Sequence, residues 1–337
     1  MMMGIGIAAA GLARGTWWPQ GAAFAVDFAS QRAMRDGSPV PTTDAYTFER
    51  ASVAWAPRLD GVHAMFEADR PRIVAGHGVL LESASANKVP NSAMAGAALG
   101  EVGAGGALPD DWSIPSVFDA VTVVDFGTGA DGLPFIDLEI VQDRTAAESG
   151  FPQIAFAPSP AVVPAEPNVP LCGSFGFRVI ARDPSDTVTT SFQVVETYTE
   201  AIEGIAAAYG ALPDAAGPIQ TVATSNDADD ESVANVRFRF QAQVYGGLRL
   251  HRTIRIVAPQ LEPDRTAPSS PIVTSGEAAV RAADGLALDA GEGSFDWHIR
   301  YGDGTEAQLA VGHEGVLLVD PEALAQHWVA AIWAVAV

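Results

Sequence analysis

The stretch from Leu248 to Thr274 constrains the fold of this 337-residue chain more than any other. Up to Val257, leucines and isoleucines mostly alternate with arginines and a histidine. This alternation is typical of a strand with one buried and one wetted face. Prolines then stand at positions 259, 263, 268 and 271. Because proline interrupts helices and favours extended conformations, the stretch predicts a strand that continues into an extended, turn-rich segment.

Short candidate strands separated by turn residues recur through the middle of the chain. Eight of them are residues 120–126, 134–141, 153–156, 172–181, 187–198, 219–223, 233–244 and 248–257. Eight antiparallel strands are the number in a double-sheet jelly roll. We therefore predict an all-β protein built on an antiparallel jelly-roll β-sandwich, with an N-terminal arm and a small C-terminal β region. Residues 200–212 are the exception, because their composition favours a short helix.

The sequence divides into four consecutive regions. Residues 1–30 form an apolar arm for attachment or oligomerisation, and residues 31–107 form a region of short strands. Residues 108–275 form the jelly-roll module. Residues 276–337 form a C-terminal β region with a tight turn at residues 301–304, and are either a third unit or an extension of the sandwich.

The apolar arm lacks the positive charge that precedes the apolar run of a signal peptide, and it is too short to span a bilayer. Trp17 and Trp18 follow it. Exposed tandem tryptophans are rare on monomers, so we expect both to contact a neighbouring subunit or a base protein. The alternative is that they pack on the chain's own β-domain. The apolar C-terminal stretch is also short, and we predict no membrane insertion.

The chain is strongly acidic, with 41 acidic and 19 basic residues and a net charge of −22. A nucleic acid or an anionic membrane would need a basic surface, so neither is an expected partner. The densest acidic cluster contains Asp227, Asp229 and Glu231. Ca²⁺ is the cofactor that such oxygen ligands would suit, although the cluster lacks the glycine and distal glutamate of an EF-hand. A solvated loop tip is the alternative.

The single cysteine, Cys172, cannot form an intramolecular disulfide. We interpret it as a small buried apolar residue. A chain without disulfides is compatible with folding in a reducing cytosol.

Motifs for nucleophilic hydrolysis, nucleotide binding and zinc proteolysis are absent from the sequence. The six histidines are scattered. A pair of glycosidase carboxylates is set in three dimensions and stays open. We therefore predict a protein that is not an enzyme.

Aromatic rings that stack on a pyranose, together with polar side chains that bind its hydroxyls, are typical of sugar-binding sites. Trp112 follows two aspartates at a loop edge, and Tyr198, Tyr209 and Tyr245 lie in or beside candidate strands. The predicted carbohydrate site consists of Trp112, Tyr198 and Tyr245, with the strand arginines Arg249 and Arg252 available to an acidic glycan. For each ring, a place in the core is the alternative.

Two stretches resemble one protein family. The first is "APQLE…APSSPIVT", residues 258–274. The second matches an F-x-R-x-S strand, a P-R turn and a G-x-L-L-E-x-x-x-x-N pattern, at Phe48, Arg50, Ser52, Pro71, Arg72, Gly78, Leu80, Leu81, Glu82, Asn87 and Ser92. Together they resemble tail and head-spike fibre proteins of phages and of gene transfer agents. The chain has Ser85-Ala86 where that family has an Arg-Thr pair.

This resemblance implies a structural fibre or spike of a virion or phage-like particle, made in the bacterial cytoplasm and released on lysis. Its partners would be cell-surface capsular polysaccharide and other virion or spike-base proteins, and the protein would form a homo-oligomer. One alternative is a polysaccharide depolymerase, although no β-helix repeat is visible. The other is a purely structural capsid or tail decoration protein.

Overall fold

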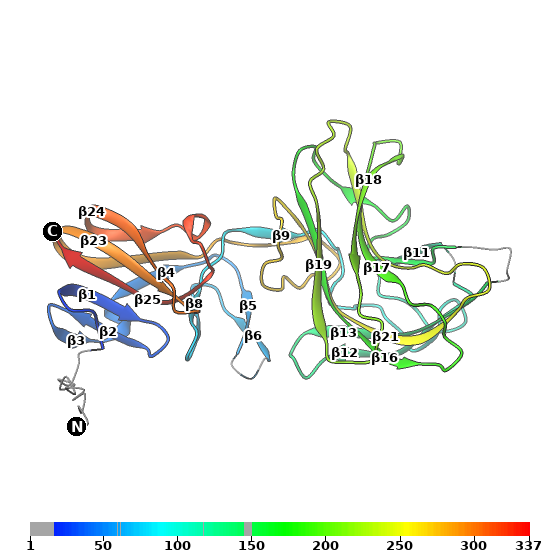
Figure 1. Ribbon diagram of the computed structural model, residues 1–337, viewed down its shortest axis with the longest axis horizontal. Helices are drawn as coiled ribbons and strands as arrows, with labels where there is room; N and C mark the ends of the chain where they lie inside the picture. Colours follow the sequence, from blue (N-terminus) through cyan, green and yellow to red (C-terminus); the bar gives the residue numbers. More distant parts are fainter. Residues whose placement is uncertain (1–16, 59, 61, 117, 145–149) are drawn as a thin grey trace, which may run out of the picture. The chain divides into compact units, whose positions relative to one another are not determined.

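A computed structural model describes residues 17–58, 60, 62–116, 118–144 and 150–337 (Figure 1). The chain folds into two compact units, each made of segments that are distant in the sequence. Unit 1 contains residues up to 49, 73–81 and 285–337, and unit 2 contains residues 50–72 and 82–284. This division differs from the four consecutive regions that the sequence predicted. Residues 31–107 are divided between the two units, and most of the predicted C-terminal region joins the N-terminal strands in unit 1.

Unit 1 is a nine-stranded antiparallel sheet with the central order β24-β23-β25-β1-β2-β3, to which β4, β7 and β8 are attached. These strands are β1 (Ala22–Asp27), β2 (Arg32–Arg35), β3 (Ser38–Val40), β4 (Tyr46–Glu49), β7 (Arg72–Val74), β8 (Gly78–Leu80), β23 (Gly285–Tyr301), β24 (Glu306–Val319) and β25 (Trp328–Ala336). Its core contains Phe24, Trp297, Ile299 and Ile332. The β23–β24 connection is the expected tight turn, in which Gly304 N donates to Tyr301 O.

Pairing of β1 with β25 explains why the C-terminal region is not a separate unit. Phe24 lies opposite Ala334 and Val26 opposite Ile332, so apolar residues from both ends of the chain enter one core. Two single-turn 3-10 helices complete the unit, η1 (Thr42–Asp44) and η2 (Pro321–Ala323). The Asp320 side chain caps η2 by accepting a hydrogen bond from Glu322 N.

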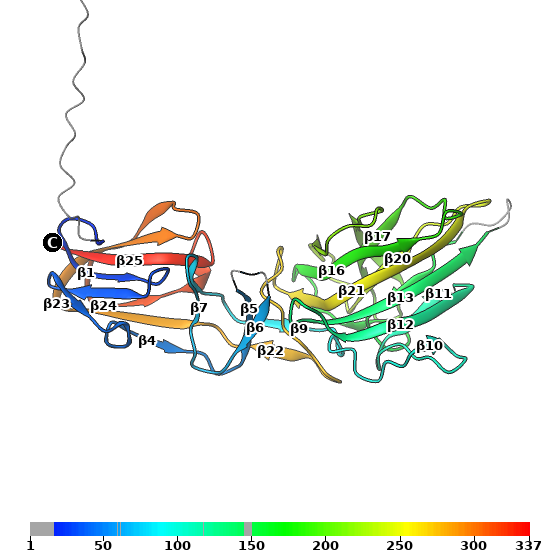
Figure 2. The same cartoon turned by 90° about the horizontal axis from the view of Figure 1, so that it is seen from below.

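Unit 2 is the predicted sandwich, built from two antiparallel sheets (Figure 2). The first has the order β10-β12-β13-β21-β16-β19, with β10 (Gly100–Glu101), β12 (Ala120–Thr128), β13 (Pro134–Asp143), β16 (Leu171–Arg182), β19 (Gln220–Asn226) and β21 (Arg249–Pro263). The second has the order β11-β14-β20-β17-β18 with β15 beside β20: β11 (Ser113–Ser116), β14 (Gln153–Ala155), β15 (Val163–Pro164), β17 (Ser191–Tyr198), β18 (Gly204–Ala211) and β20 (Asn235–Ala242). All eight predicted strands are present.

The core of the sandwich lies between these two sheets. Phe175 and Ile254 point inward from the first sheet, and Phe156 and Phe238 from the side of the second. Cys172 is buried on β16, where burial raises the pKa of its thiol to about 11. The antiparallel β-sandwich fold predicted from the alternation is confirmed. Two small ribbons, β5 (Ala54–Pro57) with β6 (His63–Phe66) and β9 (Ser85–Asn87) with β22 (Ala279–Arg281), also belong to unit 2.

Two local predictions need correction. Residues 200–212 are not helical, because β18 occupies Gly204–Ala211 and pairs with β17 along its whole length. This ladder outweighs the helix propensity of the alanines. The strand predicted to end near residue 257 continues to Pro263. Pro259 is tolerated because the β16–β21 register shifts between Val257 and Gln260, and proline fits a strand at such a bulge.

Within the part of the chain that the structure describes, no helix has the length and apolar character needed to cross a membrane.

Candidate functional site

Trp112, predicted as a sugar platform, belongs to the core of the sandwich. Its side chain is 8% exposed, and its Nε1 donates to Asn91 O at 2.8 Å. The ring packs edge-on against Phe156, with centroids 4.7 Å apart. No broad face of the indole is open to a ligand, so this prediction is corrected: the preceding aspartates lie on a turn that leads the ring inward.

Arg249 and Arg252 lie on the first sheet and are engaged with carboxylates. Arg252 is buried and binds Asp186 through two hydrogen bonds of 2.8 Å and Asp214 through one of 3.0 Å. Arg249 is partly exposed and pairs with Asp143 at 3.0 Å. Because Tyr198 belongs to the second sheet and Arg252 to the first, the structure does not bring these two predicted residues into one site. Arg252 instead binds the loops that contain Asp186 and Asp214 to the first sheet.

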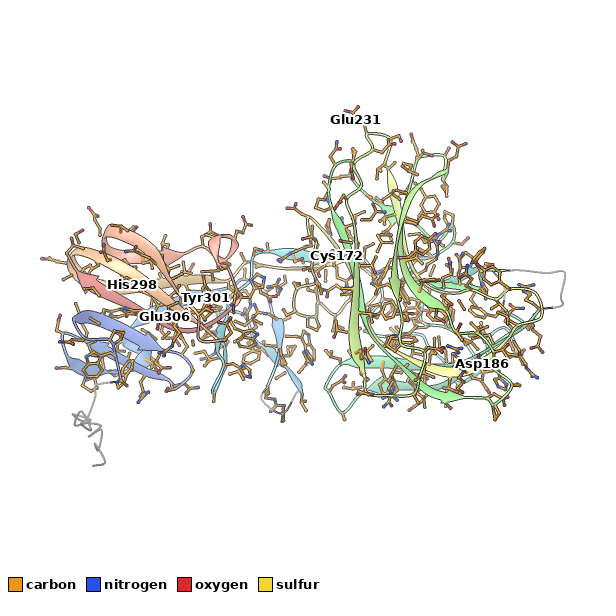
Figure 3. The ribbon with its side chains drawn as sticks, viewed as in Figure 1. Cys172, Asp186, Glu231, His298, Tyr301 and Glu306 are labelled. Atoms are coloured by element: carbon orange, nitrogen blue, oxygen red, sulfur yellow. The ribbon has the colours of Figure 1, made fainter. Side chains whose placement is uncertain are left out.

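The acidic cluster forms a loop rather than a set of metal ligands. Asp230, between the predicted ligands Asp229 and Glu231, accepts hydrogen bonds from the backbone and side chain of Ser232. Figure 3 shows Glu231 at the outer tip of this loop. Among the residues with described positions, no three His, Cys, Asp or Glu side chains are arranged to hold a metal ion. The positions of Asp227, Asp229 and Glu231 therefore match the alternative of a solvated loop tip.

Trp17 and Trp18 pack on unit 1. This matches the alternative that both rings pack on the chain's own β-domain. Their rings meet edge to face at 5.3 Å, and the Arg32 guanidinium lies 4.9 Å from the Trp17 ring centroid. Both rings join a small cluster with Met34 and Trp333. Most of the predicted arm, residues 1–16, lies outside the described residues.

The two family-like stretches meet inside unit 2 through buried polar side chains. Asn87 Nδ2 donates to the carbonyls of Pro259 and Ile272, and Asn87 Oδ1 accepts from the backbone of Leu261. Ser92 and Thr274 exchange hydrogen bonds in the same way. Asn87 and Ser92, two of the residues that carry the resemblance, therefore join chain segments about 180 positions apart.

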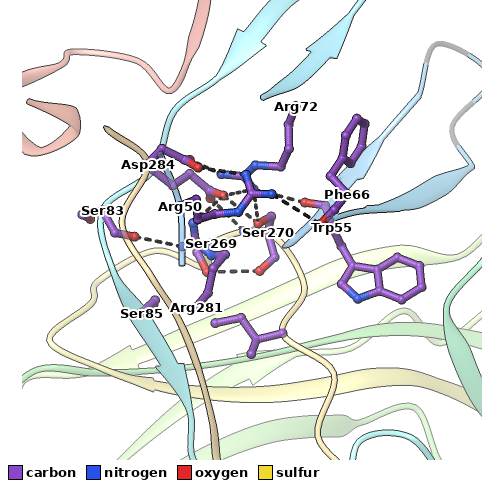
Figure 4. Close-up of polar contacts among 12 residues, drawn as sticks. Arg50, Trp55, Phe66, Arg72, Ser83, Ser85, Ser269, Ser270, Arg281 and Asp284 are labelled. Atoms are coloured by element: carbon purple, nitrogen blue, oxygen red, sulfur yellow. Dashed lines mark hydrogen bonds and ion pairs between the residues drawn. The ribbon is translucent and has the colours of Figure 1, made fainter. Parts of the chain in front are cut away.

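A buried ion network continues this contact (Figure 4). Arg72 pairs with Glu82 at 2.6 Å and with Asp284, and Arg50 pairs with Asp284 at 3.1 Å. Arg281 lies 3.1 Å from Glu82. Burial would raise the pKa of the Glu82 carboxyl, but the charges of Arg281 and Arg72 and hydrogen bonds from Ser270 hold it near 2. These side chains are inaccessible to a ligand and stabilise the fold.

Exposed aromatic side chains gather on the outer face of the second sheet. On β14 and β20, Ile154 and Phe240 enter the core, so Gln153 and Gln241, which lie opposite one another, are on the outer side of the sheet. Gln153 is half-buried there, whereas Gln241 is only 5% exposed beneath its neighbours. Phe192 on β17 lies opposite Gln241 and shares this face. We call the surface the glutamine–aromatic face, and it comprises Phe151, Gln153, Phe192, Tyr209, Gln241, Gln243 and Tyr245.

Aromatic rings on this face are open to solvent. Tyr209 is 56% exposed, and its ring meets Phe192 edge to face at 5.7 Å. Tyr245 and Phe151 are 51% and 43% exposed. Tyr245 follows β20, and its hydroxyl accepts a hydrogen bond from Gln243 Nε2. Phe151 stands beside β20, because Gly150 forms a bridge with Val244. Rings and amides of this kind match the apolar faces and hydroxyls of a sugar chain.

A hydrogen-bonded row of charged side chains borders the face. Arg239 Nε donates to Gln241 Oε1 at 3.1 Å, and Arg239 Nη1 pairs with Glu196. Tyr198 also bonds to Glu196, and burial together with this bond raises the pKa of its hydroxyl to about 12. Arg237 covers the Tyr198 ring at 4.7 Å. Tyr198 is therefore a buried support for Arg239 and Glu196 rather than a stacking surface.

Of the residues predicted for the carbohydrate site, Tyr198 and Tyr245 lie on this side of the second sheet in the structure. The sequence did not indicate Phe151, Phe192 or the glutamines. The alternation of glutamine and arginine with phenylalanine along β20 was the available signal. Tyr209 was mentioned, but the helix predicted for residues 200–212 hid its position opposite Val194.

No protein-family model matches the sequence, and no curated protein matches it. An arabinose-bound GH51 α-L-arabinofuranosidase aligns with 65% of the chain at 12% identity and a TM-score of 0.35. A carbohydrate-binding module of the β-sandwich superfamily aligns with 71% at 8% identity and a TM-score of 0.34. The CBM22-1–GH10 modules of xylanase 10B from Clostridium thermocellum, in complex with xylohexaose, align with 47% at 13% identity and a TM-score of 0.30.

The chain spans 32% of the arabinofuranosidase, 26% of the xylanase structure and 96% of the carbohydrate-binding module. At these TM-scores the alignments carry no argument about ligand or activity. The case for a function therefore depends on the glutamine–aromatic face itself.

Proposed function

We propose that the protein is a fibre or spike component of a virion or phage-like particle that adheres to cell-surface polysaccharide. Binding takes place on the glutamine–aromatic face of unit 2, without cleavage of the glycan. The observation that carries the proposal is the edge-to-face contact between the exposed Tyr209 ring and the half-buried Phe192 ring, on a face that also holds the half-buried amides of Gln153 and Gln243. The location in a particle and the homo-oligomer are supported by the sequence resemblance.

The arrangement of the face fits a sugar chain better than a peptide or a nucleic acid. The rings offer apolar surfaces for the C–H faces of pyranoses, and the amides both donate and accept hydrogen bonds with hydroxyls. Arg237, Arg239 and Glu196 add a net charge of only about +1, too little for a nucleic-acid surface on a chain of charge −22. Rings and amides fixed on strands also lose little conformational freedom on binding.

The test is adsorption of the purified protein to host-type capsular polysaccharide, measured by calorimetry together with an assay for newly released reducing ends. We expect saturable binding, no reducing ends, and an affinity about fivefold or more lower in Tyr209→Ala, since an aromatic contact contributes about 1 kcal/mol. Val280→Ala is the matched control, because Val280 is 67% exposed and lies on β22, away from this sheet.

Three outcomes would contradict the proposal. Release of reducing ends would indicate a depolymerase. Absence of binding to any host glycan would indicate a purely structural decoration protein. Equal binding by Tyr209→Ala and the wild type would remove the glutamine–aromatic face as the site.

A further inference from the structure

A concave site lies in unit 2, at the end of the sandwich where β15, the start of β16 and the end of β21 meet. It is a hollow of about 420 Å³, within the range of about 300–1,000 Å³ that is usual for small-molecule sites. Its walls are mostly apolar, with Pro164, Val169, Leu171 and Pro263 among them. Three charged side chains also line it, Lys88, Glu166 and Asp264.

Lys88 is held on a rigid part of the chain. Its backbone N donates to Leu261 O at 2.8 Å. The preceding side chain, Asn87, is fully buried and is fixed to Pro259, Leu261 and Ile272. The position of the Lys88 main chain at the hollow is thus set by the fold, and only the side chain can adjust to a ligand.

The three charged side chains at the hollow, one cationic and two anionic, form no ion pair with one another. Lys88 is the single lysine among the 19 basic residues of the chain, and it forms no ion pair with any residue whose position is described. Glu166 and Asp264 are exposed. On a protein with 41 acidic residues, a half-buried ammonium group without a carboxylate partner is available to an anionic group from outside.

We propose that this hollow binds one sugar residue that carries a carboxylate, a uronic acid. Lys88 pairs with the ligand carboxylate, Glu166 and Asp264 accept hydrogen bonds from ring hydroxyls, and the proline, valine and leucine side chains contact the C–H face of the ring. The inference rests on the proposed function for its choice of a glycan, but the site is separate from the glutamine–aromatic face. It adds selection for acidic polysaccharide.

The single lysine makes a direct experiment available. Reductive ¹³C-methylation labels the ε-amine of Lys88 and the α-amine of the chain, and Lys88→Arg identifies the α-amine signal because that variant lacks the other. Titration of the labelled full chain with D-glucuronate should shift the Lys88 signal saturably. D-glucose and acetate at the same concentrations should leave it in place. No shift with glucuronate overturns the proposal, and an equal shift with acetate overturns its sugar component.

Two unlabelled variants complete the test by calorimetry with D-glucuronate. Lys88→Met should lower the affinity about tenfold or more, as expected for loss of a charge-assisted hydrogen bond, and thermal unfolding at the wild-type temperature confirms that the variant is folded. Tyr209→Ala should bind glucuronate with wild-type affinity. If Tyr209→Ala loses polysaccharide but keeps glucuronate, both sites stand. If Lys88→Met binds glucuronate like the wild type, the hollow is not the site, whatever the result for the glutamine–aromatic face.

Discussion

Arg50 Nη1 lies 3.1 Å from Asp284 Oδ1, although the two residues are 234 positions apart and both side chains are fully buried. They are also the first and last residues of unit 2. The two chain segments of this unit end at Arg50, Arg72, Glu82 and Asp284, and these same four residues, together with Arg281, form the buried ion network. The four terminal residues of the two segments are thus held together by ion pairs that lie within unit 2.

The first prediction is that removal of one carboxylate from this network strongly destabilises unit 2. Asp284→Ala leaves the guanidinium groups of Arg50 and Arg72 buried without their shared partner, which costs about 3–5 kcal/mol. Urea unfolding should show this loss. Asp289→Ala is the control, because Asp289 lies on β23 in unit 1 and is exposed, and its effect should stay within about 0.5 kcal/mol. A loss of under 1 kcal/mol in Asp284→Ala would show that the network is dispensable.

The second prediction concerns pH. The folded state lowers the pKa of Glu82 from 4.5 to about 2, so the ionised carboxylate contributes stability that is fully present above pH 4.5. This stability is lost as the pH falls toward 2, and amounts to about 3 kcal/mol at most. Unfolding free energies of the wild type and Glu82→Gln at pH 7, 4 and 3 should converge as the pH falls. A constant difference between the two proteins would contradict the assigned pKa.

The third prediction separates packing from binding. Trp112→Ala removes a core ring and leaves a cavity beside Phe156, so it should cost about 3–5 kcal/mol of stability. Trp112→Phe should recover part of this. If Trp112→Phe retains the fold yet loses glycan affinity that Tyr209→Ala retains, the site would include Trp112 after all.

Periodicity predicted the sandwich well because most of its long strands carry their own alternation. At β13, for example, Ile136, Leu138 and Ile140 face the core while Asp137 and Glu139 face out. Pairings between distant segments leave no comparable local signal. Nothing near Phe24 indicates Ala334 as its neighbour, and nothing near Arg50 indicates Asp284. The sequence could therefore predict strands, but not the division of the chain into two interleaved units.

The candidate site was harder to predict for the same reason. Whether an aromatic residue is buried depends on the segments that pack against it. Trp112 is buried in the structure, whereas Tyr209 is exposed. Trp112 stands beside two aspartates but turns into the core, where Asn91 O receives its indole N–H. Tyr209 lies in an alanine-rich segment that suggests a helix, and becomes exposed only because β18 pairs with β17.

The last prediction uses Cys172 as a reporter of the sandwich. Its side chain is buried on β16, and burial together with the nearby Glu262 carboxylate raises the pKa of the thiol to about 11. Since the thiolate is the reactive form, a thiol reagent should label the native protein only as unit 2 opens. The labelling rate should therefore rise in Asp284→Ala, which weakens the network of the same unit, and stay at the wild-type value in Asp289→Ala. Mass spectrometry after a timed pulse of reagent measures both rates. Rapid labelling of the folded wild type at pH 7 would place the thiol at an accessible position and contradict the described core.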